Sequence, residues 1–414
     1  MPMTYSYRTI ISSGALIAGL IFYGVYHELV VVSIMPLRSM KTFSPNISMK
    51  KKVVKLIFWH EEAWHTEDVD VIWSDTNMVH NIHLIINRWL SVLDEEKVMD
   101  KKVTLQSVIL SPSSREAFLS FDRNPLKFED AAYVKLMWCE GLLKTIRDNG
   151  IPIESLRFLV HHAPLDDEHI DLAFSWPISG FLNTVAVPAQ IPQSGSTSGT
   201  DEVARNFHLR STTTPRPFTI MIDPAGDAKH AGRMLEDNFE RGVTLQCANY
   251  LKGELERKYA NVRVVLTRFP GETLEPLQNA NFANRLQVDF YMSIHFYQDF
   301  ENNPAIFLFR YVKHPTDRWA KTYVPLSLIS YDQVHLIQNR LTDRWSSLMY
   351  ESFKKTTQSG VKNLAIPFLP LKGIYAPALG IEVGLRHKND WQHYISPCIQ
   401  ALGEIISADP GLKS

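Results

Sequence analysis

The C-terminal half of this chain contains several apolar segments that end at a side chain able to bind a metal. Three such runs end at Asp223, His295 and Glu382, and Glu240 opens a predicted long helix. An α/β protein presents its ligands where apolar strands end at one edge of a sheet. His and carboxylate side chains gathered there can hold a metal that activates water. The pattern therefore predicts an α/β fold with a zinc hydrolase site.

Short motifs in and between these segments indicate a protein family. They read Leu-Thr-Arg at 266–268, Ala-Asn at 283–284 and Ser-Ile-His at 293–295. In order and spacing they resemble the catalytic domain of the zinc-dependent N-acetylmuramoyl-L-alanine amidases, which cut the bond between muramic acid and the stem peptide. The resemblance covers about residues 218–406. It implies a peptidoglycan hydrolase that uses Zn²⁺.

The resemblance also implies roles for individual residues. Glu240 matches the family's Glu ligand, His295 matches its second His ligand, and Glu382 matches its late catalytic Glu. In such a site the metal lowers the pKa of a bound water to about 7, and Glu382 takes the proton and passes it to the leaving amine.

One ligand of the family is missing from this chain. The family has Asp-Pro-Gly-His after its first strand, whereas here Gly226 stands at the His position. Asp227 and His230 both follow closely, and zinc accepts carboxylate oxygen as well as imidazole nitrogen. We favour Asp227 as the third ligand because it is nearest the strand end, and His230 remains the alternative. The family's Arg four residues before Ala-Asn is Asn279 here, which affects substrate positioning.

Each of these residues also has an ordinary structural interpretation. His295 could be a structural histidine, and Glu240 could be a solvated residue of an amphipathic helix. Asp227 and His230 could cap the following helix or face solvent. The missing His supports an alternative function as well, namely a catalytically degenerate amidase-like protein that binds peptidoglycan or a cell-envelope partner.

The predicted architecture has several parts. A chain of 414 residues exceeds one ordinary domain, so two folded domains are expected. The amidase-like domain at 218–410 should form a mixed, largely parallel sheet with helices on both faces. Residues 189–217 are rich in Ser, Thr, Gly and Pro and predict a flexible linker.

A smaller α+β domain is predicted at 51–188. Its strands and helices alternate by pattern, with strands at 53–59, 103–110 and 155–160 and helices at 78–93 and 131–148. This order is similar to the GerM-like domain of sporulation and germination proteins. The similarity implies a binding or assembly module that meets the wall or an envelope partner, and a spacer without a ligand is the alternative.

The N-terminus carries a long apolar run. Residues 10–26 are almost wholly apolar and the run resumes at 29–32, and about 17–25 apolar residues suffice to span a bilayer. We predict an uncleaved transmembrane anchor at 1–36, with a cleaved signal peptide or a buried helix as alternatives. More Lys and Arg follow the run than precede it, so the positive-inside rule alone argues against export. A wall substrate argues for it, and we expect the inner membrane with the catalytic domain in the periplasm.

Composition excludes two other classes of protein. The formal net charge is −1, which gives no sign of a nucleic-acid groove. The three cysteines form neither a disulfide framework nor a Cys-based zinc motif. A neutral surface suits a sugar-rich polymer as substrate.

Overall fold

The computed structural model describes residues 49–182, 216–275, 277–300, 304–319 and 329–408. The predicted anchor at 1–36 and nearly all of the predicted linker lie outside these ranges. None of the helices in the described ranges has the length and apolar character needed to cross a membrane. The described residues belong to one compact unit.

The first half of the described chain, residues 49–182, begins with a long hairpin followed by a helix. Strands β1 (Met49–His60) and β2 (Ala63–Ser74) pair antiparallel along their whole length. Helix α2 (Met78–Glu95) follows, and the Asn77 side chain accepts the His80 N–H to cap it. The sequence predicts β1 and α2, but β2 carries four polar residues in a row at 65–68 and was not predicted.

A second sheet completes the first half. Its strand order is β3-β4-β5-β6, with β7 also paired to β5. Strands β4 and β5 are parallel because helix α3 crosses between them. The bounds are β3 Leu105–Leu110, β4 Glu116–Phe121, α3 Ala132–Asp148, β5 Ser155–Val160, β6 Ala163–Pro164 and β7 Trp176–Pro177. The elements agree with the predicted α+β order, while the GerM-like resemblance stays a prediction.

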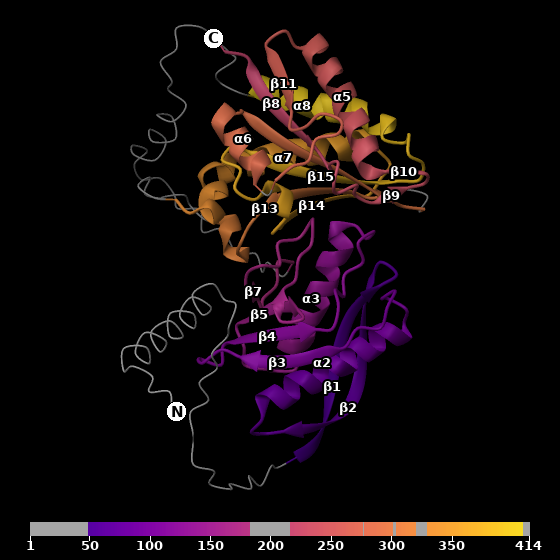
Figure 1. The fold of residues 1–414 in the computed structure, drawn as a ribbon, viewed down its shortest axis with the longest axis vertical. Coiled ribbons are helices and arrows are strands. Elements are labelled where there is room, and N and C mark those ends of the chain that lie inside the picture. Colours follow the sequence, from indigo (N-terminus) through magenta and orange to yellow (C-terminus); the bar gives the residue numbers. More distant parts are fainter. Residues whose placement is uncertain (1–48, 183–215, 276, 301–303, 320–328, 409–414) are drawn as a thin grey trace, which may run out of the picture. The chain divides into compact units, whose positions relative to one another are not determined.

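The second half is built on a six-stranded mixed sheet (Figure 1). Its order is β11-β8-β12-β15-β13-β14, and every neighbouring pair is parallel except β15 and β13. The prediction of a mixed, largely parallel sheet is therefore confirmed. The strands are β8 Phe218–Pro224, β11 Val262–Leu266, β12 Phe290–Gln298, β13 Ile306–Tyr311, β14 Val361–Ile366 and β15 Ala378–Leu385.

The helices and short elements of the second half lie between these strands. A small hairpin of β9 and β10 precedes α5, and three 3-10 helices occur in the later part. The bounds are β9 Met234–Leu235, β10 Asn238–Phe239, α5 Glu240–Lys258, α6 Gln278–Leu286, η1 Pro315–Trp319, η2 Tyr331–Gln338, α7 Asn339–Thr356, η3 Leu369–Leu371 and α8 Gln392–Ala408.

The two faces of the six-stranded sheet have different cover. Alternate residues of the strands, such as Ile220 and Met292, are buried in one core cluster together with residues of α5, α7 and α8. The opposite face, including Tyr291 and Phe307, belongs to a second cluster that also contains α6 and the core of the first half. The first half is therefore part of the hydrophobic cover of this sheet.

Candidate functional site

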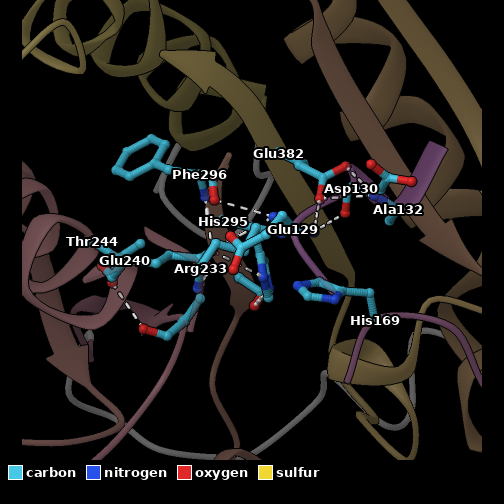
Figure 2. Close-up of polar contacts among 12 residues, drawn as sticks. Glu129, Asp130, Ala132, His169, Arg233, Glu240, Thr244, His295, Phe296 and Glu382 are labelled. Atoms are coloured by element: carbon cyan, nitrogen blue, oxygen red, sulfur yellow. Dashed lines mark hydrogen bonds and ion pairs between the residues drawn. The ribbon is translucent and has the colours of Figure 1, made fainter. Parts of the chain in front are cut away.

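The centre of the six-stranded sheet brings two predicted site residues together. His295 on β12 and Glu382 on β15 are paired in register on neighbouring parallel strands. Residues in register on such strands project to the same face. Both side chains therefore point to the face that the first half covers, and they are 5% and 0% exposed. Figure 2 shows them near Glu240, Arg233 and His169.

Glu240 reaches the same place from the start of α5. Its Oε1 accepts the Phe296 N–H at 2.9 Å, and its Oε2 accepts the Arg233 N–H at 3.1 Å. Gly232 permits this approach, because a Cβ there would lie 2.8 Å from the Glu240 side chain. Burial raises the pKa of Glu240, while Arg233 acts to lower it. The carboxylate is fixed in place and each oxygen keeps a lone pair.

The protonation of His295 follows from its hydrogen bonds. Its Nε2 lies 2.8 Å from Ser293 Oγ, which lies 3.2 Å from Asp223 Oδ2. A carboxylate only accepts, so the Ser293 hydroxyl donates to Asp223 and accepts the Nε2–H of His295. The Nδ1 of His295 then carries a lone pair. This atom is buried without a hydrogen-bond partner in the described part of the chain, and it lies 3.7 Å from Glu240 Oε1.

Glu382 is held by three donations. The N–H of Ala132 at the start of α3 lies 3.0 Å from Oε1 and 2.9 Å from Oε2. Arg233 donates to Oε1 at 2.7 Å, and its other bonds reach the carbonyls of Asp130 and Phe296. Burial alone would lower the pKa of Arg233, but Glu382 and Glu240 raise it above its usual value. These contacts fix the Glu382 carboxylate in position.

The structure adds a residue that the sequence did not predict. His169, 2% exposed, lies with His295 and Glu240 so that one ligand atom of each is within 4.8 Å of the other two. The rings of His169 and His295 meet edge to face with centroids 5.3 Å apart. No motif marks His169, because it lies outside the amidase-like segment and far from the other two in sequence. His169 is distinguished from the other described histidines of the first half by its burial, which the sequence alone does not show.

Asp227 and His230, the two predicted third ligands, are not part of this group. Asp227 accepts the N–H groups of Lys229, His230 and Leu274 at 2.7, 2.6 and 3.0 Å. Burial acts to raise its pKa, but these hydrogen bonds prevail and lower it to about 2. The side chain of His230 is 49% exposed. Asp227 shapes the loop, and the role of either residue as a ligand stays a prediction without support from the geometry.

The chemistry of the group fits a divalent metal. Two imidazoles and one carboxylate are a common ligand set for catalytic zinc. Burial lowers the pKa of His169 well below 6.5, and it lowers the pKa of His295 to about 3. Both rings are therefore neutral and able to bind a metal at neutral pH. The unpaired Nδ1 of His295 is the observation that most directly indicates a missing partner.

The mixed sheet and this buried group define an α/β protein with a candidate catalytic metal centre. Residues 220–406 match the family model described as N-acetylmuramoyl-L-alanine amidase. This segment, somewhat under half of the chain, matches that family, as the sequence predicts. Glu240, His295 and Glu382 lie inside it, and His169 lies outside it.

A curated relative gives a shorter match. The chain is 36% identical over 76 residues to the N-acetylmuramoyl-L-alanine amidase CwlM of Bacillus licheniformis. The aligned part spans 18% of this chain and 30% of the relative. The chain thus covers less than a third of that relative's length.

Solved structures of amidases are also similar to part of the chain. One is the N-acetylmuramoyl-L-alanine amidase from Clostridium difficile 630, at 18% identity over 47% of this chain and 99% of that one, with a TM-score of 0.34. Another is the CwlD amidase from Clostridioides difficile in complex with the GerS lipoprotein, at 17% identity over 46% and 100% of the two chains, with a TM-score of 0.33. Because these TM-scores are low, the function is inferred from the family match and from the geometry of the site.

Proposed function

We propose that the protein is a metal-dependent N-acetylmuramoyl-L-alanine amidase, cleaving the amide bond between N-acetylmuramic acid and the L-alanine of the stem peptide. One observation carries the proposal. Within the segment that matches the amidase family, the buried Nδ1 of His295 has a lone pair and no hydrogen-bond partner among the described residues, and it lies 3.7 Å from the fixed carboxylate of Glu240. Zn²⁺ bound there would polarise the scissile carbonyl and acidify a water.

The chain's own residues have distinct tasks in this mechanism. Ser293 and Asp223 hold the His295 ring in the tautomer whose Nδ1 can bind. Phe296 and Arg233 fix the Glu240 carboxylate through their backbone N–H groups. Glu382 is the proton carrier, and Oε2 keeps a lone pair because Ala132 is the only donor to it among the residues that the structure describes.

The described state is closed to a polymer substrate. Glu382 is fully buried, and segment 129–132 supplies donors and acceptors around it. Peptidoglycan needs this segment to move away before the carbonyl can approach. We infer that turnover alternates between this closed state and an open one.

Digestion of purified sacculi tests the proposed activity. Full-length protein supplied with Zn²⁺ should release stem peptides that carry a new free amino group on L-alanine, detected by mass spectrometry. Glu382→Gln should release them at least about a hundredfold more slowly. Cleavage at any other bond, or no cleavage by the zinc-loaded protein under conditions that separate the two halves, would disprove the amidase assignment.

A second candidate function is a degenerate amidase that binds peptidoglycan or an envelope partner without cutting it. The buried ion pair between Arg233 and Glu382 favours it, since a cation already neutralises the proton carrier. Sedimentation with sacculi and no peptide release would support this candidate. The inner-membrane anchor, the periplasmic location and an envelope protein partner are further proposals, based on the apolar run at 10–26 and the wall substrate.

A further inference from the structure

The loop that holds the first ligand in the amidase family has no room for one here. Gly226 has φ of +75°, and a Cβ at this position would lie 2.8 Å from the Arg241 side chain and 3.0 Å from the His230 carbonyl. A His at 226 is therefore excluded by both backbone strain and contact. The carboxylate of the neighbouring Asp227 accepts hydrogen bonds from backbone N–H groups of Lys229, His230 and Leu274. The loop is closed on itself.

His169, which lies outside the amidase domain, approaches His295 and Glu240 where the family's first ligand is missing. Its backbone is fixed on both sides to the segment before β15, because Leu369 donates to the His169 carbonyl and Asp171 donates to the Pro367 carbonyl, both at 2.8 Å. Ile170 and Phe368 form an antiparallel bridge between these two bonds. The imidazole is thus positioned by backbone pairing and not by a loose side-chain contact.

The distances among the three ligand atoms would suit one shared metal ion after small movements of the side chains. Zinc bonds of about 2.0–2.2 Å place two tetrahedral ligand atoms roughly 3.5 Å apart. His295 Nδ1 and Glu240 Oε1 are 3.7 Å apart, and the three ligand atoms of the group lie within 4.8 Å of one another. Side-chain movements of about one ångström close that difference.

The surroundings of His169 support a ligand role. Asp167 Oδ1 lies 3.9 Å from the His169 Nδ1, and a carboxylate behind an imidazole is the usual partner of a metal-bound His. The Lys135 ammonium has three N–H groups, and it donates both to the same nitrogen at 3.3 Å and to Asp167 Oδ2 at 2.6 Å. A metal bound at the other ring nitrogen would require His169 Nδ1 to give up the Lys135 contact and to donate to Asp167 instead. Asp167 also accepts the N–H groups of His169 and Ile170, so the carboxylate and the ring move together.

Arg233 does not use the same positions. Its hydrogen bonds go to Glu382, Asp130 and Phe296, and its contact with Glu240 Oε1 is 3.8 Å, too long for a hydrogen bond. The lone pairs of Glu240 and His295 therefore remain available beside the guanidinium.

We propose that His169 is the third metal ligand, so that the metal centre is assembled from both halves of the chain and is complete only when segment 169–171 is paired with 367–369. This inference depends on the proposed metal-dependent function and deepens it. In the family domain alone, the centre would have two protein ligands.

Zinc titration of the full-length protein tests the assignment. The metal alone is the probe, bound zinc is counted by elemental mass spectrometry, and affinity is measured by competition with a chelator. The wild type should bind one zinc per chain, and His169→Gln should weaken binding by more than about a hundredfold. His162→Gln, at an exposed His of the same half, and His230→Gln should bind as the wild type does.

A second variant separates coordination from folding. His169→Glu supplies a carboxylate in place of the imidazole, so it should recover much of the zinc affinity that His169→Gln loses. Co²⁺ absorption should show a changed ligand set in His169→Glu. Wild-type affinity in His169→Gln, equal loss in both variants, or no zinc in the wild type would overturn the proposal. Zinc binding that depends on His169 without cleavage of sacculi would support the ligand assignment and reject the amidase activity.

Discussion

The carboxylate of Glu382 accepts the backbone N–H of Ala132, which is 250 residues earlier in the chain and opens helix α3. A helix N-terminus favours a negative charge, through its free N–H groups and its dipole. The same contact covers the residue that should carry the proton. It therefore fixes the carboxylate in position and hides it from a substrate.

Ala132→Pro removes this N–H and leaves the helix intact. Proline is well tolerated at the first helical position, and Ala131 before it has φ −55° and ψ 147°, which proline permits. A hydrogen bond to a charged group contributes about 1.5–3 kcal/mol, so the open state should gain roughly tenfold or more in population. Initial rates on sacculi should rise by a similar factor. Ala132→Gly keeps the N–H and is the control, and a lower rate in Ala132→Pro with an intact fold would contradict the closed-state model.

Arg233→Ala leaves Glu382 and Glu240 buried without their cation. Breaking a buried ion pair by removing one partner costs about 3–5 kcal/mol, and we expect a loss of that size in the free energy of unfolding. Urea unfolding of the metal-free protein measures it. Lys51→Ala removes half of an exposed pair with Asp70 and should cost less than about 1 kcal/mol. Equal losses in the two variants would show that the buried pair contributes nothing specific.

Asp227 should contribute stability that disappears in acid. Its pKa is about 2 in the folded protein, below the ordinary value of 3.8, so the contribution is fully present above pH 4 and is lost as the pH falls from about 4 to 2. The size is about 2 kcal/mol. Asp227→Asn should be less stable than the wild type at pH 6, with the difference shrinking toward pH 2. A difference that stays constant over this range would refute the assigned pKa.

Ser293→Ala removes the hydroxyl that fixes the His295 tautomer. Loss of a hydrogen bond behind a metal-bound His typically costs ten- to a hundredfold in affinity, and we expect a zinc affinity lower by about that factor. Chelator competition measures it. Ser352→Ala is the matched control, because this buried hydroxyl bonds the Pro397 carbonyl far from the site. The relay from Asp223 has no role if both variants bind zinc equally.

Glu382→Gln should separate chemistry from binding. General acid–base catalysis contributes about 10²–10⁴-fold, so turnover should fall by that factor or more while one zinc per chain remains. His295→Ala should lose both the metal and the activity, because it removes a ligand. Zinc content and peptide release are measured on the same samples. Full zinc stoichiometry in His295→Ala would remove His295 from the site.

Sequence patterns predicted most of the second half because its signals are local. Strands β12 and β15 are mostly apolar runs, and the motifs carrying Glu240, His295 and Glu382 lie in one stretch of chain. The sequence analysis placed His295 and Glu382 at strand ends, whereas both lie inside their strands, which continue to Gln298 and Leu385. His169 could not be predicted in this way. Its position depends on the pairing of 169–171 with 367–369, a contact between residues about 200 apart that leaves no periodic trace.

The strand β2 shows a different kind of failure. Its residues are mostly exposed and polar, and its place is set by full-length pairing with β1 and not by burial.

The prediction of Asp227 as third ligand relied on closeness to the strand end, whereas Asp227 is held by the turn that Gly226 makes possible.

The shared core limits how this domain can be moved between proteins. A fragment that begins at Arg216 would carry the whole family match and still leave Tyr291, Phe307 and Phe309 without the partners that bury them. We expect such a fragment to aggregate, because a contiguous apolar face on a soluble protein seeks another surface. Gene fusions or truncations that treat the C-terminal half as an interchangeable module would thus fail first in solubility, before any question of catalysis arises.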